Sequence, residues 1–208
     1  MGFLPLDKVE RGFYSQGHAE RLESLAGHAA LALSNALNFG ELEQASITDY
    51  VTGTFNHRYF QQMLRREISR AQRCSHPVSI LMIDLDDFKL VNDMHGHPFG
   101  DRLLCVLAER MEAHLRGIDI LARYGGEEFA LILPGTSLQS LSAVGERLRT
   151  TVAAKPFGIN GYDVHLAVSV GGATFPDSAH EAHQLVECAD QAMYRAKQNG
   201  RNRVYVTV

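Results

Sequence analysis

The stretch Arg123-Tyr124-Gly125-Gly126-Glu127-Glu128-Phe129 lies between two short apolar runs, residues 118–122 and 129–133, and it decides the fold. Two strand-like runs separated by Gly-Gly predict a β-hairpin, because two-residue hairpin turns need positive φ angles that glycine adopts at low cost. The adjacent carboxylates Glu127 and Glu128 then lie at the hairpin tip, where their repulsion is unfavourable unless a cation is present. An isolated Gly-Gly-Glu-Glu is more often a solvated acidic turn, so the interpretation depends on a second acidic strand.

That second strand is predicted by the apolar run 78–83, which ends in Asp84-Leu85-Asp86-Asp87-Phe88-Lys89. Carboxylates at the end of a buried central strand are a common metal site. If this strand pairs with the hairpin, a spacing of about 4.8 Å brings Asp84 close to Glu127. Two divalent ions roughly 3.5–4 Å apart could share such carboxylates and clamp a phosphoryl group. Hard oxygen ligands favour Mg²⁺ over Zn²⁺.

Bulk composition limits the class of protein. The chain has 208 residues, which suits one domain with an appendage, and its 45% hydrophobic content supports a core. A net charge of −4 argues against a non-specific nucleic-acid binder. Three scattered cysteines without metal or redox spacing predict a reducing, cytoplasmic setting. The sequence has neither a signal-peptide pattern nor an apolar stretch of about 18 residues, so no membrane segment is expected.

The N-terminal part has helical periodicity from about His18. Its apolar residues step by three and four, as in a coiled-coil seam; they are Leu22, Leu25, Ala29, Ala32, Ala36 and Phe39. Such a helix could pack on its own domain or associate with a second copy. We favour self-association, because no preceding domain is long enough to receive it.

Other elements follow from capping and periodicity. Asn56 is a predicted N-cap for a helix that runs to about Cys74. Asp101 is predicted to start a helix over residues 102–115, and an amphipathic helix is predicted over 138–154. A strand is expected over 163–170, followed by Gly171-Gly172, with a hairpin partner around 157–159.

Asn92 and Asp101 follow the acidic strand and offer an amide and a carboxylate. Together these groups suit the donor and acceptor edge of guanine. Alone, each has a simpler explanation, since Asn92 could cap a turn and Asp101 could begin a helix.

Together these stretches resemble the GGDEF-domain diguanylate cyclases, in the GGEEF variant. The resemblance covers residues 49–206 and rests on five motifs in order: Asp84-Leu85-Asp86-Asp87-Phe88-Lys89, Asn92-Asp93, Gly96-His97 with Gly100-Asp101, Gly125-Gly126-Glu127-Glu128-Phe129, and the segment from Ala189 to Asn202. It implies an α+β fold like the palm of nucleotide cyclases (ferredoxin-like), with a central, mostly antiparallel sheet flanked by helices. It also implies the reaction, in which two GTP give cyclic di-GMP and two pyrophosphates.

The resemblance assigns roles to matching residues. Asp84, the Leu85 carbonyl and Glu127 would hold Mg²⁺ or Mn²⁺, and Glu127, Glu128 and Lys89 would act in catalysis. The implied GTP-binding residues are Phe88, Asn92, Asp101, Gly125, Gly126, Lys197 and Arg201. Lys197 and Arg201 also fit the end of a helix that stops at Gly200, where cations are favourable.

A second site is implied at Arg116 and Asp119, with Arg147 as a further member. In the family an Arg-x-x-Asp at this spacing binds the product and inhibits the enzyme, whereas a random one would be a local ion pair. Guanidinium groups suit bidentate contact with guanine edges and phosphates.

Each active site holds one GTP, so the resemblance implies a symmetric homodimer. Residues 1–46 resemble the closing helix of a GAF sensor domain followed by a signalling helix. The resemblance implies that residues 47–208 are the cyclase domain of a bacterial signalling protein. A catalytically silent receptor for GTP or cyclic di-GMP is one alternative; it predicts damage at Asp84, Glu127, Glu128 or Lys89, and the sequence has none. A pure dimerisation module would not need the guanine-reading pair.

Overall fold

The computed structural model describes residues 17, 18, 20–30, 32 and 47–207. The chain divides into two compact units, Met1–Ser46 and Ile47–Val208. In the first unit the described residues are helical, and the seam residues Leu25, Ala29 and Ala32 are exposed. The predicted seam positions Ala36 and Phe39 lie outside the described residues. Within the described chain, no helix is long and apolar enough to cross a membrane.

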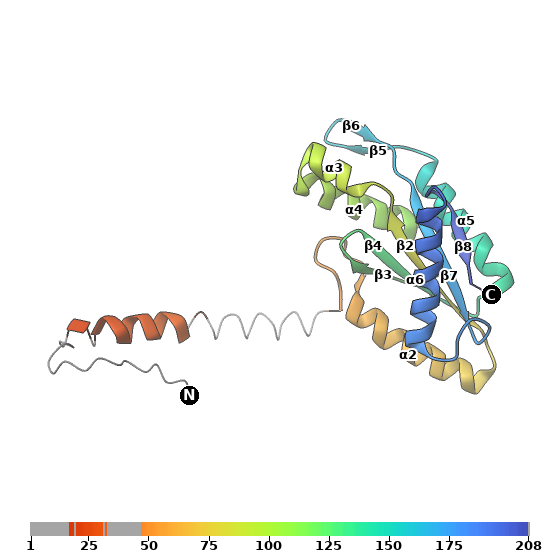
Figure 1. Ribbon diagram of the computed structural model, residues 1–208, viewed down its shortest axis with the longest axis horizontal. Coiled ribbons are helices and arrows are strands. Elements are labelled where there is room, and N and C mark those ends of the chain that lie inside the picture. The colour runs from red at the N-terminus through yellow and green to blue at the C-terminus, as the bar shows by residue number, and fades with distance from the viewer. Residues whose placement is uncertain (1–16, 19, 31, 33–46, 208) are drawn as a thin grey trace. The chain divides into compact units, whose positions relative to one another are not determined.

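The second unit is an α+β domain with a central sheet between helices (Figure 1). Its elements in chain order are β1 Phe55–Asn56, α2 His57–Cys74, β2 Val78–Leu85, α3 Phe88–His95, α4 His97–Glu112, β3 Ile120–Gly125, β4 Glu128–Pro134, α5 Leu138–Ala153, β5 Phe157–Ile159, β6 Tyr162–Val164, β7 Val168–Phe175, α6 Ala182–Gln198 and β8 Val204–Val206.

The main sheet has the order β1-β3-β4-β2-β7-β8. Strand β2 lies near its centre and pairs antiparallel with both β4 and β7, and β3 pairs antiparallel with β4. The two edge pairs, β1 with β3 and β7 with β8, are parallel. The predicted class, a mostly antiparallel sheet flanked by helices, is confirmed.

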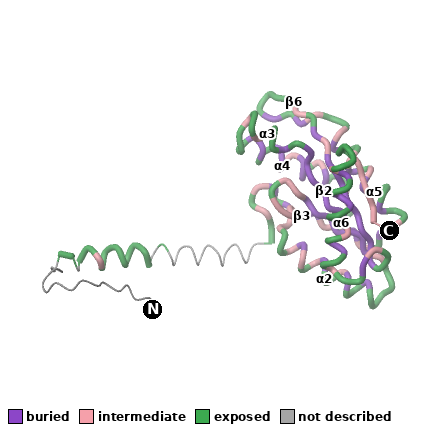
Figure 2. Tube along the Cα trace, in the orientation of Figure 1, coloured by how far each residue is buried: buried purple, intermediate pink, exposed green. Residues whose placement is uncertain are grey.

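Side chains of β2 alternate between two cores, as the period of two in a strand requires. Leu81, Ile83 and Leu85 pack with residues of α4 and α5 on one face. Ile80 and Met82 pack with residues of α2 and α6 on the other. The strand is buried throughout, as the burial tube shows along β2 (Figure 2). Asp84 is the next alternate residue after Ile80 and Met82, so it lies on the face of β2 that packs against α2 and α6.

Two helix predictions are confirmed. Helix α2 begins after Asn56, whose side chain accepts a hydrogen bond from the Tyr59 amide at 2.9 Å, and it ends at Cys74. Helix α5 occupies Leu138–Ala153, one residue short of the predicted end.

The predicted start of the next helix is wrong. Helix α4 begins at His97 rather than after Asp101, and Asp101 lies within it. Pro98 fits the first turn, where its missing N–H costs nothing and its φ is already helical. Gly96, with φ of 84°, makes the break between α3 and α4. Gly100 is a buried residue inside this helix, where a Cβ atom would clash with Asn92.

The strand predicted over residues 163–170 is also wrong. It is two strands, β6 and β7, and Gly171-Gly172 lie inside β7 rather than after it. Strand β6 pairs with β5 in a separate two-stranded sheet, so the hairpin partner predicted around residues 157–159 is confirmed.

Candidate active site

Carboxylates from two neighbouring strands meet at one end of the sheet. The register pairs Asp84 of β2 with Glu128 of β4, and both belong to the rows that face α2 and α6. Glu127, which we expected near Asp84, lies at the hairpin tip directly before Glu128. Its carbonyl accepts a hydrogen bond from the Leu85 amide at 3.4 Å, and burial and the charge of Asp84 raise the pKa of its carboxyl. The β2–β4 register therefore makes Glu128 the direct cross-strand neighbour of Asp84.

The turn of this hairpin also differs from the prediction. A register irregularity between Arg123 and Gly125 makes Gly125 the last residue of β3, opposite Glu128. The two tip residues are therefore Gly126, with φ of 28°, and Glu127, rather than Gly125 and Gly126.

Lys197 completes the group from the last turn of α6. Its Nζ lies 2.7 Å from Asp84 Oδ2, and the Asp84 side chain is 8% exposed. Helix α6 reaches this position because it packs directly on β7 at Gly171. A Cβ atom at Gly171 would lie 2.1 Å from the Ala189 carbonyl oxygen, so only glycine permits this approach.

The carboxylates of Asp84, Glu127 and Glu128 repel one another unless a cation in addition to Lys197 is present. Burial raises the pKa of Asp84 above its usual value, although Lys197 opposes the shift. Burial and the charge of Asp84 raise the pKa of Glu127, and the same two causes come first for Glu128. Binding of a cation would relieve this repulsion.

Within the described residues, no group of three or more histidine, cysteine, aspartate or glutamate side chains is already arranged as a metal centre. The donor set nevertheless fits a hard divalent cation. It consists of carboxylate oxygens whose pKa is raised by burial and by their mutual charge, and Lys197 already supplies a cation to one of them. Oxygen ligands of this kind suit Mg²⁺ or Mn²⁺.

Two residues that sequence reasoning missed hold the hairpin tip. Arg123 donates to the Gly126 carbonyl from Nε at 3.0 Å and from Nη2 at 2.7 Å, and its Nη1 lies 3.2 Å from Asp49 Oδ1. Burial would raise the pKa of Asp49, but hydrogen bonds from Thr52 and the charge of Arg123 hold it below its usual value. The available signal was a charged residue, Arg123, shortly before the Gly-Gly of the turn.

Asp86 is a third missed residue. Its side chain is buried. It accepts a hydrogen bond from the Ser169 hydroxyl at 2.7 Å and another from the backbone N–H of Asn202 at 2.9 Å. Asp86 thereby ties the end of β2 to β7 and to the segment that follows α6, and so fixes the neighbourhood of Asp84 and Lys197.

The predicted guanine-reading residues lie on α3 and α4. Asn92 Oδ1 is buried, and among the described residues it is the buried side-chain polar atom that lacks a hydrogen-bond partner. Gly100 of α4 makes room for it, since a Cβ there would lie 2.0 Å from Asn92 Oδ1 and 3.0 Å from Phe88 Cζ. Asp101 follows on α4 and is exposed. A buried acceptor without a donor is costly, so this arrangement is suited to a ligand that supplies one.

The remaining predicted phosphate contacts are more open. Lys89 is exposed on α3. Arg201, with φ of 60°, lies 3.6 Å from Asp87 Oδ1, and both side chains are more than half exposed. Such an exposed pair contributes little to stability and leaves Arg201 available to a ligand.

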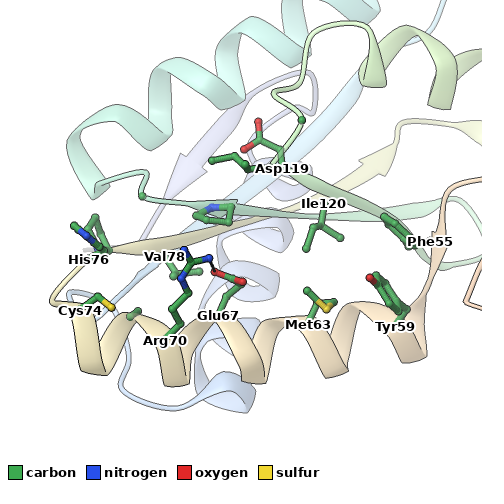
Figure 3. A pocket seen from close by; sticks show the side chains of 16 residues that line it. Phe55, Tyr59, Met63, Glu67, Arg70, Cys74, His76, Val78, Asp119 and Ile120 are labelled. Atoms are coloured by element: carbon green, nitrogen blue, oxygen red, sulfur yellow. Dashed lines mark ion pairs between the residues drawn. The ribbon is translucent and has the colours of Figure 1, made fainter.

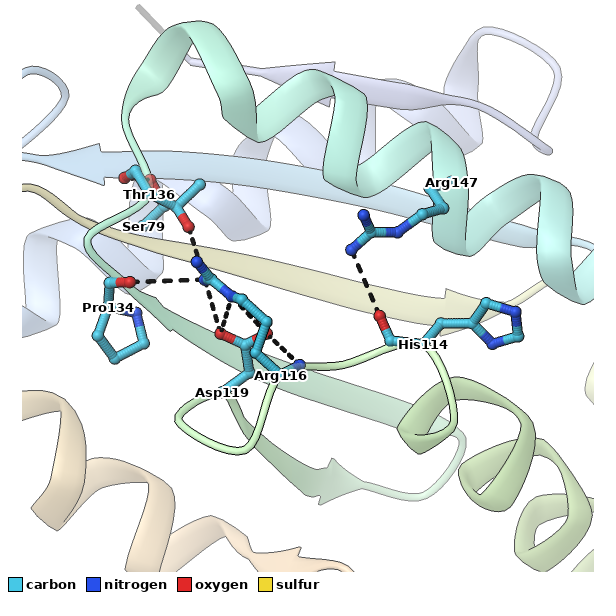
Figure 4. A network of polar contacts seen from close by, with 7 residues as sticks. All are labelled: Ser79, His114, Arg116, Asp119, Pro134, Thr136 and Arg147. Carbon is cyan, nitrogen blue, oxygen red and sulfur yellow. Dashed lines mark hydrogen bonds and ion pairs between the residues drawn. The ribbon is translucent and has the colours of Figure 1, made fainter.

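Figure 4 shows the polar contacts made by the residues of the predicted second site, Arg116, Asp119 and Arg147. Arg116 donates to Asp119 through Nη2 at 2.7 Å and to Thr136 Oγ1 at 2.9 Å. Arg147 donates to the His114 carbonyl at 3.3 Å. Both arginines line a pocket of about 430 Å³, while the Asp119 side chain is only 1% exposed. Asp119 therefore positions Arg116 rather than facing the pocket.

A separate apolar groove of about 530 Å³ lies between α2 and β3 (Figure 3). Tyr59 and Met63 line one wall, and Ile118 and Ile120 line the other. The groove does not include Asp84, Glu127 or Glu128, so it is not the place where the carboxylates meet.

Comparisons with known proteins agree with this geometry. The family model described as diguanylate cyclase, GGDEF domain, matches residues 46–203, and the chain therefore belongs to that family. Diguanylate cyclase A of Treponema denticola is 36% identical over 209 residues, which cover 98% of this chain and 55% of that protein. The chain thus spans little more than half of that relative.

Solved structures are similar to the second unit. The GGDEF domain of DgcB from Caulobacter crescentus, in complex with c-di-GMP, is 31% identical with a TM-score of 0.72; the match covers 77% of this chain and 92% of that one. The active GGEEF domain of a diguanylate cyclase from Vibrio cholerae is 33% identical with a TM-score of 0.68, covering 74% and 97%.

Proposed function

We propose that this chain is a diguanylate cyclase that condenses two GTP into cyclic di-GMP and two pyrophosphates. The observation that carries the proposal is the register of Asp84 against Glu128, beside the Gly126-Glu127 tip and the Lys197 ammonium. Carboxylates and a lysine at the end of two central strands suit the transfer of a nucleotidyl group, which depends on charge neutralisation and positioning.

In each half-reaction the ribose 3′-oxygen of one GTP attacks the α-phosphorus of the other. The new bond is O3′–Pα, and the bond from Pα to the oxygen bridging the β-phosphate breaks, so pyrophosphate leaves with the electron pair. The proton of the 3′-hydroxyl is lost. A second attack in the opposite sense closes the ring.

Asp84, Glu127 and the Leu85 carbonyl would hold Mg²⁺ or Mn²⁺. Such an ion, when bound, neutralises phosphate charge and makes the hydroxyl more acidic. Glu128 has a pKa raised by burial and by Asp84, which brings it closer to the range suited to accepting the hydroxyl proton. Lys89, Lys197 and Arg201 would bind the phosphates, and Gly125 and Gly126 would allow close approach of the backbone.

Recognition of guanine falls to Asn92 and Asp101. The unpartnered Asn92 Oδ1 would accept a hydrogen bond from the guanine edge, and the exposed Asp101 carboxylate would accept another. Guanine presents an N–H and an amino group side by side, whereas adenine does not, so two acceptors favour GTP over ATP.

Regulation follows from the second pocket and from the N-terminal unit. Arg116 and Arg147 would bind cyclic di-GMP and cause product inhibition. Because one site holds one GTP, we propose a homodimer as the active species. Residues 1–46, as the end of a GAF-like sensor with a signalling helix, would transmit a signal to residues 47–208.

The test is an incubation of purified protein with GTP and Mg²⁺, followed by chromatographic separation of the nucleotides, with Glu127→Ala alongside. Cyclic di-GMP from the parent, and none from the variant, is the expected result. A stable dimer that binds GTP and forms no product would overturn the proposal in favour of a receptor.

A further inference from the structure

The outer face of α3, defined by Lys89, Leu90, Asp93 and Met94, combines apolar and charged side chains. All four residues are exposed, and the two apolar ones are strongly so: Leu90 is 60% and Met94 is 78% exposed. Residues four apart are neighbours on a helix surface, so Leu90 lies beside Met94 and Lys89 beside Asp93. Among the described elements, α4 is the one that packs extensively against α3, on its opposite face.

The charges on this face are arranged against the stability of an isolated helix. Lys89 is the second residue of α3, and Asp93 lies in its last turn. Cations are favourable near a helix C-terminus and anions near an N-terminus, so α3 has the opposite order. A second α3 running antiparallel would place its Asp93 near Lys89 and its Lys89 near Asp93. The face is therefore complementary in charge to itself.

The face also borders the candidate active site. Helix α3 begins two residues after Asp86, and it carries Asn92, whose Oδ1 faces Gly100 of α4. Joining two GTP molecules requires two such sites to face each other. A two-fold contact between α3 helices would place two helices that each carry an Asn92 next to each other.

We propose that the outer face of α3 is the surface on which two copies of this domain meet during the reaction, with Leu90 of each copy packed against Met94 of the other. This inference rests on the proposed function. Four side chains cover far less than the roughly 800 Å² per partner of a stable interface. The contact therefore orients two copies and does not create a permanent dimer.

The experiment uses Leu90→Glu and Met94→Lys in the full chain, alone and as an equimolar mixture. Each variant alone is expected to form cyclic di-GMP roughly tenfold or more slowly than the parent. The reason is that both contacts related by the two-fold axis then place a charged side chain against an apolar one. Binding of a non-hydrolysable GTP analogue is expected to stay within about twofold of the parent, because neither side chain belongs to the proposed nucleotide site. Tyr50→Glu, at a side chain 93% exposed and outside these sites, is the control and should retain parental turnover.

The mixture gives the decisive result. In a mixed pair, Glu at position 90 meets Lys at position 94, while the second contact keeps the parental Leu90 and Met94. Turnover of the mixture should therefore exceed the mean of the two variants by about threefold or more, since oppositely charged residues now meet. Parental turnover in both single variants, or a mixture no better than their mean, would overturn the inference alone. An inactive parent would overturn the proposed function as well.

Discussion

Lys197 Nζ lies 2.7 Å from Asp84 Oδ2 and joins the last turn of α6 to the end of β2. The lysine supplies positive charge to a buried carboxylate at the place where the proposed reaction also needs it. Lys197→Met should lower turnover of GTP by ~100-fold, as loss of one preorganised donor commonly does.

The same substitution should strengthen binding of Mn²⁺ in the absence of nucleotide, because Asp84 loses its competing cation. Calorimetric titration of parent and variant with Mn²⁺ measures this. Weaker Mn²⁺ binding in the variant would show that Lys197 does not compete for the carboxylates.

Glu128→Gln should stabilise the fold while it removes activity. An acid whose pKa is raised in the folded state binds more protons there, so the free energy of unfolding falls as pH rises through the interval between the ordinary and the raised pKa. In metal-free buffer at pH 7 the variant should unfold about 2–4 °C higher, equivalent to about 1 kcal/mol.

The gain from Glu128→Gln should disappear at pH values below 4.5, the ordinary pKa of the carboxyl, where the parent is also neutral. It should also shrink when Mg²⁺ is added. Melting curves across this pH range decide the point, and a gain that does not change with pH would contradict the electrostatic cause.

Gly100→Ala should weaken GTP binding. The new Cβ would lie 2.0 Å from Asn92 Oδ1, so the amide must move away from the place where we expect guanine. KM for GTP should rise about tenfold or more, with a smaller change in kcat. Gly158→Ala is the matched control, because its Cβ would meet only Asp163 Oδ1 at an ordinary 3.6 Å. Equal KM values for the two variants would remove Asn92 from the guanine site.

Arg123→Lys should loosen the hairpin tip. Arg123 holds the Gly126 carbonyl with two nitrogens and reaches Asp49 with a third, which a lysine ammonium cannot reproduce. We expect kcat to fall about tenfold with a small change in stability, because misplacement of the acidic tip affects the reacting geometry. Parental kcat would show that the tip is held by the strands alone.

Arg147→Ala should relieve product inhibition. It removes a cation from the Arg116 pocket and costs only the hydrogen bond to the His114 carbonyl. The concentration of cyclic di-GMP that halves the rate should rise about tenfold, equivalent to one charge-assisted contact.

Arg116→Ala should have the same effect on inhibition, but it also removes the guanidinium that pairs with the buried Asp119 carboxylate. It should therefore be less stable than Arg147→Ala by about 1–3 kcal/mol. Unchanged inhibition in both variants would sink the assignment.

The central hairpin, β2, α2 and α5 could be predicted because their patterns are local, whereas β6 and β7 were merged into one predicted strand. Gly-Gly between two apolar runs was enough to predict the hairpin, and the Asn56 N-cap was enough to predict the start of α2. The pairing of Asp84 with Glu128 could not be predicted, because the register of β2 against β4 joins segments distant in sequence. The turn was misplaced by one residue because of the register irregularity between Arg123 and Gly125.

The start of α4 was misplaced because Asp101 was expected to start the helix. The helix instead begins at His97 and packs Gly100 against Asn92 and Phe88.

Partners distant in sequence were also beyond local reasoning. Asp49 and Arg123 are 74 residues apart, and Asp86 accepts from Asn202 over 116 residues. Their roles follow from the tertiary fold, since each charge is compensated only when separate elements come together. By contrast, Lys197 and Asp84 could be named from motifs, although their direct contact could not.

The most direct measurement of the central claim is the stoichiometry of products by phosphorus NMR, with Mg²⁺, for the parent and Asp84→Asn. We predict that the parent releases two pyrophosphates for each cyclic di-GMP, without orthophosphate, and that Asp84→Asn releases neither. Release of orthophosphate and GDP, or equal cyclic di-GMP formation by Asp84→Asn, would contradict the account.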